Sequence, residues 1–137
     1  MLDKVSKSAH GNSFKDAVLD VLKALKNEGR IDSIRLGKRY GQFYAPFLVE
    51  AHGDNIIIFT TTSARSDRIK ENQWDAWGIK NAVGKDSKCV LILPDELSEK
   101  ERLSYDNEKQ RIIESGYISQ IDKIAQLKDL KSIFNLQ

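Results

Sequence analysis

Residues 43–62 read FYAPFLVEAHGDNIIIFTTT and predict two β-strands joined by a turn. Residues 56–62 are rich in β-branched side chains, which strands favour. His52-Gly53-Asp54-Asn55 has the composition of a turn, so residues 43–51 and 56–62 are expected to pair as an antiparallel hairpin. Pro46 indicates an edge or a bulge in the first of these strands, because proline has no N–H to donate.

Upstream of this hairpin, the sequence predicts a helix over residues 13–27 and a short strand over residues 31–36. Apolar residues from Phe14 to Leu25 recur at helical spacing and form one stripe. Asn12 or Ser13 can cap the start of this helix, and Gly29 suits a left-handed stop.

Downstream, a second helix is expected over residues 66–82, with Ser66 or Asp67 as its cap. Residues 90–93 are apolar without alternation, which is typical of a strand covered on both faces. Ser98 and Glu101 have the spacing of a capping box, which opens a third helix that ends before Gly116. Between residues 118 and 133, apolar residues every three positions favour a helix, although a short strand at residues 121–125 is the alternative.

These elements predict one α/β domain over residues 1–137, with a mixed central sheet flanked by helices. The order is helix, three-stranded meander, helix, strand, helix. No stretch approaches the roughly 20 apolar residues that span a bilayer, and residues 1–7 do not precede the apolar core of a secretory signal. The lone Cys89 lies in an apolar run and is expected to be buried. We therefore expect a cytoplasmic protein with no membrane partner.

The distribution of charge is compatible with a polyanionic partner. The net charge is +2, but residues 1–88 contain 15 Lys or Arg against 11 Asp or Glu. A mild basic bias of this kind suits nucleic acid. An ordinary solvated surface of mixed charge accounts for it equally well.

The stretch most informative about function is residues 60–80, which read TTTSARSDRIKENQWDAWGIK. Hydroxyl side chains at the end of a strand, followed by Arg65 and Arg68 at the start of a helix, are groups that bind phosphate oxygens. The alternative is structural, with Asp67 and Arg68 forming a local cap and ion pair. Trp74 and Trp77 could stack on bases, but tryptophans at this spacing more often pack in a core or an interface.

The order of elements and several short motifs together resemble the PD-(D/E)XK nuclease superfamily, in particular type II restriction endonucleases. The motifs are Gly11-Asn12-Ser13-Phe14 before the first helix, residues 63–68, Gln73-Trp74-Asp75-Ala76, and Gln73 with Trp77. The resemblance implies a restriction-endonuclease-like fold and Mg²⁺-dependent hydrolysis of phosphodiester bonds in double-stranded DNA.

The sequence departs from that family where the family places its catalytic acids. An acid on the second strand and Asp/Glu-x-Lys on the third are both missing, since the third strand reads Ile58-Phe59-Thr60-Thr61. Carboxylates are the ligands that hold Mg²⁺. We therefore expect Glu50 and Asp54 as substitute metal ligands, and Asp75 and Lys70 as further catalytic residues.

The resulting hypothesis is a DNA endonuclease that uses Mg²⁺ and acts as a homodimer, with the Trp74 helix or the C-terminal tail as the interface. Ser63, Arg65, Arg68, and Lys38 with Arg39 in a loop at residues 37–41, are expected to contact DNA. The alternative is an inactive DNA-binding module, or a subunit that completes its active site with a partner chain. A protein-interaction domain is a third, more distant possibility.

Overall fold

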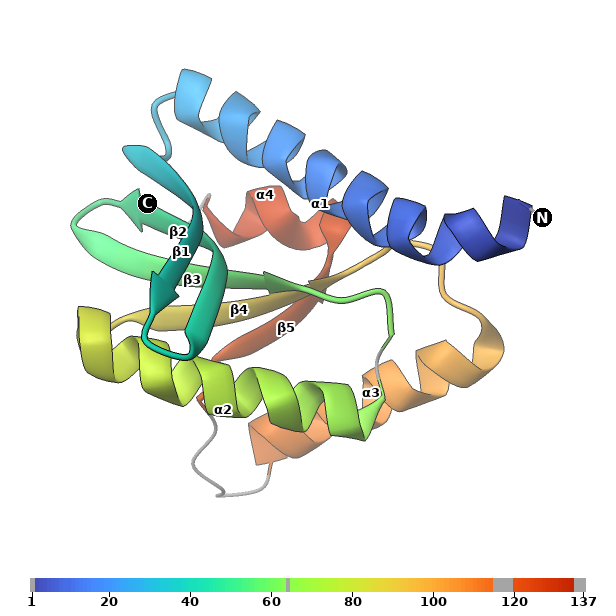
Figure 1. Ribbon diagram of the computed structural model, residues 1–137. Coiled ribbons are helices and arrows are strands. Elements are labelled where there is room, and N and C mark those ends of the chain that lie inside the picture. Colours follow the sequence, from blue (N-terminus) through green and yellow to red (C-terminus); the bar gives the residue numbers. More distant parts are fainter. Residues whose placement is uncertain (1, 64, 115–119, 135–137) are drawn as a thin grey trace.

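Three antiparallel strands and a parallel extension form the sheet at the centre of the protein (Figure 1). The computed structural model describes residues 2–63, 65–114 and 120–134. Its elements are α1 (Leu2–Asn27), β1 (Ser33–Tyr40), β2 (Phe43–Ala51), β3 (Asp54–Thr60), α2 (Ser66–Val83), β4 (Lys88–Leu93), α3 (Glu99–Glu114), β5 (Lys123–Gln126), a 3₁₀ turn η1 (Leu127–Asp129) and α4 (Leu130–Ile133).

The strands lie in the order β1-β2-β3-β4-β5. The first two neighbouring pairs are antiparallel, while β3, β4 and β5 are parallel. The expected single α/β domain with a mixed sheet is therefore confirmed.

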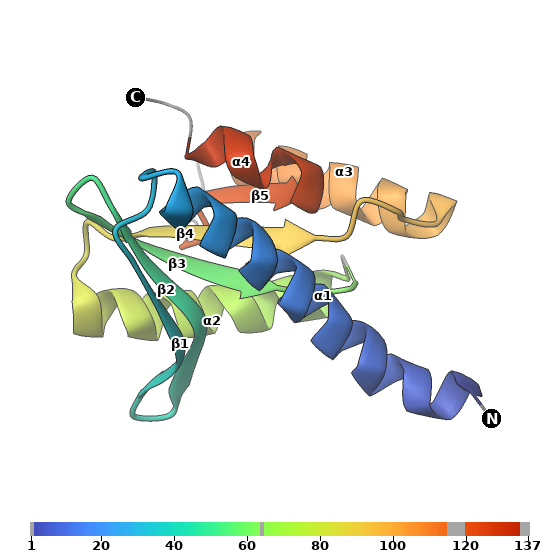
Figure 2. The ribbon, with the colours of Figure 1, turned by 90° about the horizontal axis from the view of Figure 1, so that it is seen from above.

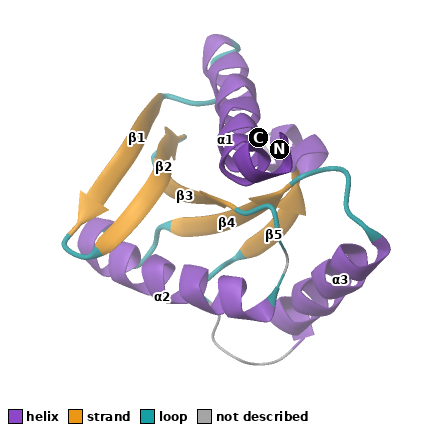
Figure 3. Cartoon of the chain, turned by 45° about the vertical axis from the view of Figure 1, so that its right-hand side comes forward, coloured by secondary structure: helices purple, strands orange, loops and turns teal. Residues whose placement is uncertain are grey.

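Helices cover both faces of the sheet, as Figure 3 shows. On one face α1 and α4 pack through residues such as Leu22 and Leu130 against the strand residues Val49, Ile58 and Ile92. On the other face, α2 and α3 pack against the alternate strand residues, among them Leu48, Ile57 and Leu91. The two cores follow from the alternation of side chains along each strand. Buried β4 lies between them, and Cys89 within it is fully buried.

The helix α1 begins at Leu2, so the start expected at Asn12 or Ser13 is wrong. One glycine in a helix costs only about 1 kcal/mol relative to alanine, and Gly11 does not interrupt it. Figure 2 shows the N-terminal half of α1 running out past the strands. The stop at Gly29 is confirmed, because this residue has φ 81° and Arg30 N–H donates to the Leu25 carbonyl at 2.9 Å.

The β1–β2–β3 meander differs from the prediction in detail. The strand β1 extends to Tyr40, and its pairing with β2 skips Gly37, which has φ 59°, and Pro46. The register is the same on both sides of Pro46, so the bulge expected as one alternative is wrong. The other alternative, an edge, fits locally, because Pro46 precedes Phe47, where the pairing of β2 with β3 begins. The turn into β3 contains His52 and Gly53, both with positive φ, as short hairpin turns require.

The elements that follow β3 agree with the sequence except at two points. The N-cap position of α2 is occupied by Arg65 without a side-chain capping bond, so the caps expected at Ser66 and Asp67 are wrong. Ser98 does cap α3, since its Oγ accepts the N–H of Glu101 at 3.2 Å. Residues 123–126 form β5 rather than the favoured helix, because they pair with β4. Ile118 lies outside the described residues.

Candidate functional site

A cavity of about 440 Å³ lies at the carboxyl end of β3 and is the candidate functional site. Its walls come from three elements: the end of β3, the start of α2 and the middle of α1. The lining residues are Phe14, Lys15, Thr60, Thr61, Thr62, Ser63, Arg65 and Arg68. Ligand sites in α/β proteins commonly lie at the carboxyl ends of parallel strands, and β3 and β4 are parallel here.

Hydroxyl groups give the loop between β3 and α2 its shape. The Thr61 hydroxyl donates to the Ser63 carbonyl at 2.9 Å and accepts the Ser63 N–H at 3.2 Å. The N–H of Thr61 donates to the Ile92 carbonyl at 3.1 Å, which joins the loop to β4. The Ser63 hydroxyl accepts the Arg65 N–H at 3.4 Å. Thr61 and Ser63 therefore have internal roles, and they orient the first residues of α2.

Arg65 and Arg68 are exposed, and each makes a local ion pair. Arg65 lies 3.1 Å from Asp67, and Arg68 lies 3.7 Å from Glu71. The arginine side chains remain 62% and 56% exposed. Such surface pairs contribute at most about 1 kcal/mol, so a phosphate that binds a guanidinium in two places can compete with the carboxylate. The alternative expected a cap and an ion pair from Asp67 and Arg68, but Asp67 pairs with Arg65 and Arg68 pairs with Glu71. Both arginines remain accessible from solvent.

Two residues of α1, Phe14 and Lys15, complete the cavity, although neither was predicted to lie at the functional site. Phe14 is buried in the core, and the exposed Lys15 makes no ion pair with any described residue. The positive end of the α2 dipole begins at Ser66, beside the same cavity. Three cationic side chains from two elements thus meet at one end of the sheet.

Glu101, in the first turn of α3, was predicted as part of a capping box and not as a residue near the functional site. The Ser63 hydroxyl donates to its carboxylate at 3.5 Å, although the two residues are 38 positions apart. The parallel pairing of β3 with β4 explains this contact, because the loops that follow two parallel strands emerge at the same edge of the sheet. The sequence could have indicated this contact only if the parallel pairing of the two predicted strands had been known.

The expected metal ligands Glu50 and Asp54 are not brought to this cavity. Asp54 begins β3 and Thr60 ends it, so at ~3.3 Å per residue roughly 20 Å separate them. Glu50 is paired with Asn55 and lies 3.6 Å from Arg35.

The side chains of Glu50 and Asp54 also lie on opposite faces of the sheet. Asp54 shares a face with Ile56 in the α1 core, whereas Glu50 shares a face with Leu48 in the α2 core. Within the described ranges no group of three or more His, Cys, Asp or Glu side chains is placed to hold one metal ion.

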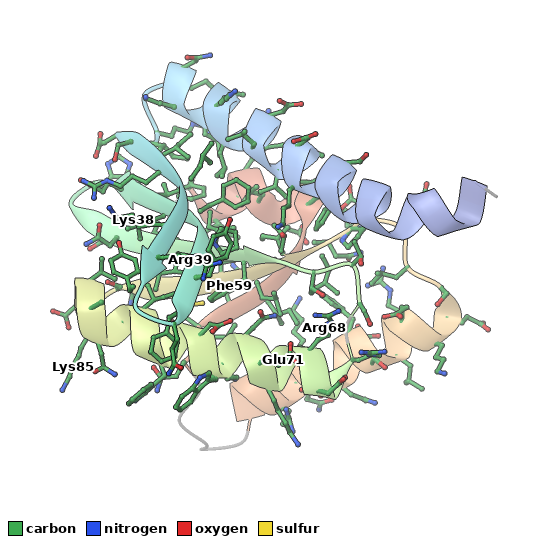
Figure 4. The ribbon with its side chains drawn as sticks, in the orientation of Figure 1. Lys38, Arg39, Phe59, Arg68, Glu71 and Lys85 are labelled. Carbon is green, nitrogen blue, oxygen red and sulfur yellow. The ribbon has the colours of Figure 1, made fainter. Side chains whose placement is uncertain are left out.

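Lys70 and Asp75, the further catalytic residues expected on α2, differ in their surroundings. Lys70 is exposed and precedes Trp74 by one helical turn, so it lies on the outer face of the helix. Asp75 is partly buried, and its pKa is raised above the ordinary value, first by burial and then by the neighbouring carboxylate of Glu71. Glu71 and Arg68 lie close together near the start of α2 (Figure 4).

Lys38 and Arg39 lie in β1 and not in the expected loop at residues 37–41. Both side chains are exposed, and the Arg39 guanidinium lies 5.1 Å from the centre of the Tyr44 ring. Neither residue lines the cavity at the end of β3.

Gln73 has a structural role in this fold. Its side-chain oxygen accepts the backbone N–H groups of Gln120 at 2.7 Å and Ile121 at 3.0 Å. It therefore anchors the segment that leads into β5. Trp74 and Trp77 are 55% and 46% exposed, so they are not core residues.

No helix among the described residues has the length and apolar character needed to cross a membrane. Comparison of the chain with protein-family models, with curated proteins and with solved structures finds no match.

Proposed function

We propose that this protein is a DNA-binding domain that holds the sugar–phosphate backbone of duplex DNA at the cavity beside β3. The observation that carries the proposal is the meeting of Lys15, Arg65 and Arg68 at a cavity edged by hydroxyl groups. Arginine and lysine side chains are usual partners of DNA phosphates, and the hydroxyls of Thr61 and Ser63 shape the loop that presents the arginines. Their exposure leaves them available to a ligand as extended as a duplex.

The order of elements supports a restriction-endonuclease-like fold within this proposal. A helix, three antiparallel strands, a second helix and a parallel strand follow one another as the resemblance to PD-(D/E)XK nucleases implies. The likeness concerns the arrangement of elements, so it bears on the fold and not on catalysis.

The placement of the carboxylates favours binding over cleavage by this chain alone. Metal-dependent hydrolysis needs carboxylate oxygens that converge on one ion, and Glu50 and Asp54 lie on opposite faces of the sheet, far from the cationic cavity. The expected Mg²⁺ ligands do not fit that role. We therefore propose a binding module, or a subunit whose partner chain supplies the catalytic centre.

Binding is tested by fluorescence anisotropy of a labelled duplex at several salt concentrations. Arg65→Ala and Arg68→Ala are each expected to weaken binding about tenfold, as the loss of a charged hydrogen bond implies. Each is also expected to reduce the slope of log K against log salt by about one, because one fewer counterion is released.

Arg35→Ala is the matched control. Arg35 makes an ion pair of 3.6 Å at 56% exposure, nearly the same as that of Arg68, but it lies on the edge strand β1 and does not line the cavity. Its removal should leave duplex binding unchanged. Equal losses in all three variants would show a general charge effect and would contradict a site at β3.

Incubation of the protein with supercoiled plasmid and Mg²⁺ separates binding from cleavage. We expect the plasmid to remain intact. Nicking that is lost in Glu101→Gln, whose carboxylate accepts the Ser63 hydroxyl, would show that the protein is a hydrolase and would contradict the binding module.

A further inference from the structure

The outer face of α2 carries a surface of exposed aromatic rings that the proposed function does not use. Trp74 and Trp77 lie on this face with Phe43 from the β1–β2 hairpin beside them. More than two fifths of each tryptophan side chain remains in solvent. Exposed tryptophans gathered at one place usually mark a binding surface.

The geometry of these rings makes a rigid platform. The two indoles are stacked, with centroids 5.1 Å apart and an interplanar angle of 17°. Phe43 meets them at steeper angles, 60° to Trp74 and 77° to Trp77, and so supports them from one side. Because the rings hold one another in place, a ligand that stacks on them has little ordering cost to overcome.

A cavity of about 250 Å³ adjoins the platform and adds polar and cationic groups. It is lined by Trp77, Lys80, Asn81, Lys85 and Gln120. Lys80 is bound to Asp122 at 2.9 Å, so much of its charge is balanced. Lys85 is exposed and makes no ion pair with the residues that the structure describes. The Asn81 amide donates to the Trp77 carbonyl at 3.0 Å, which leaves the Asn81 side-chain oxygen as an acceptor.

We propose that this surface binds single-stranded nucleic acid, with a base stacked on Trp77 and the adjoining phosphate at Lys85. Aromatic rings beside lysines are the combination that holds unpaired bases and their backbone. In a duplex, the faces of the bases are already stacked on one another, so only an unpaired base can use the platform.

A second copy of the chain fits this surface less well. A two-fold axis through the tryptophans would set the outer face of α2 against itself, because such an interface is self-complementary. Lys70 and Lys85 lie beyond the two ends of the tryptophan pair, so antiparallel α2 helices would bring Lys70 of one copy toward Lys85 of the other. An anionic ligand neutralises these lysines, whereas a second copy repels them.

This site is separate from the cavity beside β3. Arg68 lies in the first turn of α2 and Lys85 lies beyond its end, as Figure 4 shows. An 18-residue helix at ~1.5 Å per residue is about 27 Å long. The two sites can therefore be tested independently.

Intrinsic fluorescence reports on this site directly, because Trp74 and Trp77 are the only two tryptophans in the sequence. Titration with oligothymidylate should quench the emission. An abasic oligomer of the same length, which has the phosphates without the bases, should quench much less. A DNA duplex whose two ends are closed by non-nucleotide linkers has no unpaired bases, so it should bind at β3 without quenching.

Variants separate the contributions of stacking and charge. Trp77→Ala is expected to weaken oligothymidylate binding, followed by anisotropy, about tenfold or more. Lys85→Ala should also weaken it, with a smaller slope against salt. Lys88→Ala, another exposed lysine nearby in the sequence but outside this cavity, is the control and should leave binding unchanged.

Failure of this inference is distinguishable from failure of the proposed function. If Arg65→Ala and Arg68→Ala leave duplex binding unchanged while oligothymidylate still quenches, the proposed function fails and the site on α2 stands. Equal binding of oligothymidylate and the abasic oligomer would overturn base stacking. A concentration-dependent dimer in sedimentation that Trp77→Ala converts to a monomer would instead assign the surface to a second copy.

Discussion

Gly78 shows at the scale of one residue why the hairpin can pack against α2. The glycine is buried, and a Cβ at this position would overlap the ring of Phe43. Glycine is otherwise a poor helix residue, since alanine favours the helix by about 1 kcal/mol. The contact with Phe43 therefore explains a residue that helix propensity disfavours.

Gly78→Ala should consequently destabilise the protein, because overpacking costs about 1–3 kcal/mol and exceeds the gain in helix propensity. Urea unfolding measures the effect. In a Phe43→Ala background the overlap is gone, so the same substitution should become stabilising. A stabilising effect in both backgrounds would mean that Phe43 does not occupy this space.

Asp75 is the second residue with a testable environment. Its pKa is raised by burial and by Glu71, so ionised Asp75 destabilises the folded state at neutral pH. Asp75→Asn should increase the free energy of unfolding at pH 7, by the ~0.2–0.5 kcal/mol of a like-charge pair one turn apart. The advantage should fade as the pH falls through the raised pKa of folded Asp75 and should be gone below the ordinary value of 3.8, where the carboxyl is protonated in both states. A less stable variant at pH 7 would reveal a favourable partner for the carboxylate.

At the scale of elements, Asp122 joins three parts of the fold. Its carboxylate accepts from the Lys80 ammonium at 2.9 Å and from the Cys89 N–H at 2.8 Å. Asp122 immediately precedes β5, so these two bonds tie the end of α2 and the start of β4 to the start of β5. Gln73, also in α2, accepts backbone N–H groups of the same segment. Two α2 side chains, Gln73 and Lys80, therefore position the last strand.

Asp122→Asn should leave the nearly buried Lys80 without its counter-charge. We expect a loss of about 1.5–3 kcal/mol in urea unfolding, the range for hydrogen bonds to charged groups. Glu50→Gln removes an exposed ion pair with Arg35 and should cost less than about 1 kcal/mol. Similar losses in both variants would argue that Lys80 is solvated in solution.

These element contacts also explain which parts of the fold could be predicted. Helix α2 and strands β2 and β4 have strong local patterns, and their predicted positions agree closely with the structure. The strand β5 was only the less favoured alternative, because spacing in threes does not separate a strand from a helix. Its pairing with β4 and its contacts with α2 made it a strand.

At the scale of the whole molecule, the sheet divides the protein into two apolar cores and two candidate binding surfaces. One surface lies between α1 and the end of β3, and the other lies on the outside of α2. Both surfaces include residues of the segment 60–80, which the sequence already indicated as functional by its arginines, hydroxyls and tryptophans. The contributions of Lys15, Glu101 and Phe43 came from distant parts of the chain.

The amino-acid sequence by itself determined the α/β class, most strand and helix positions and the cationic loop after β3, because these depend on neighbours along the chain. The tertiary structure alone decided which side chains meet. It placed Glu50 and Asp54 on opposite faces and far from the arginines, and it brought Lys15 and Glu101 to the loop. The physical reason is that strand register and parallel pairing set these distances, and both are properties of the assembled sheet.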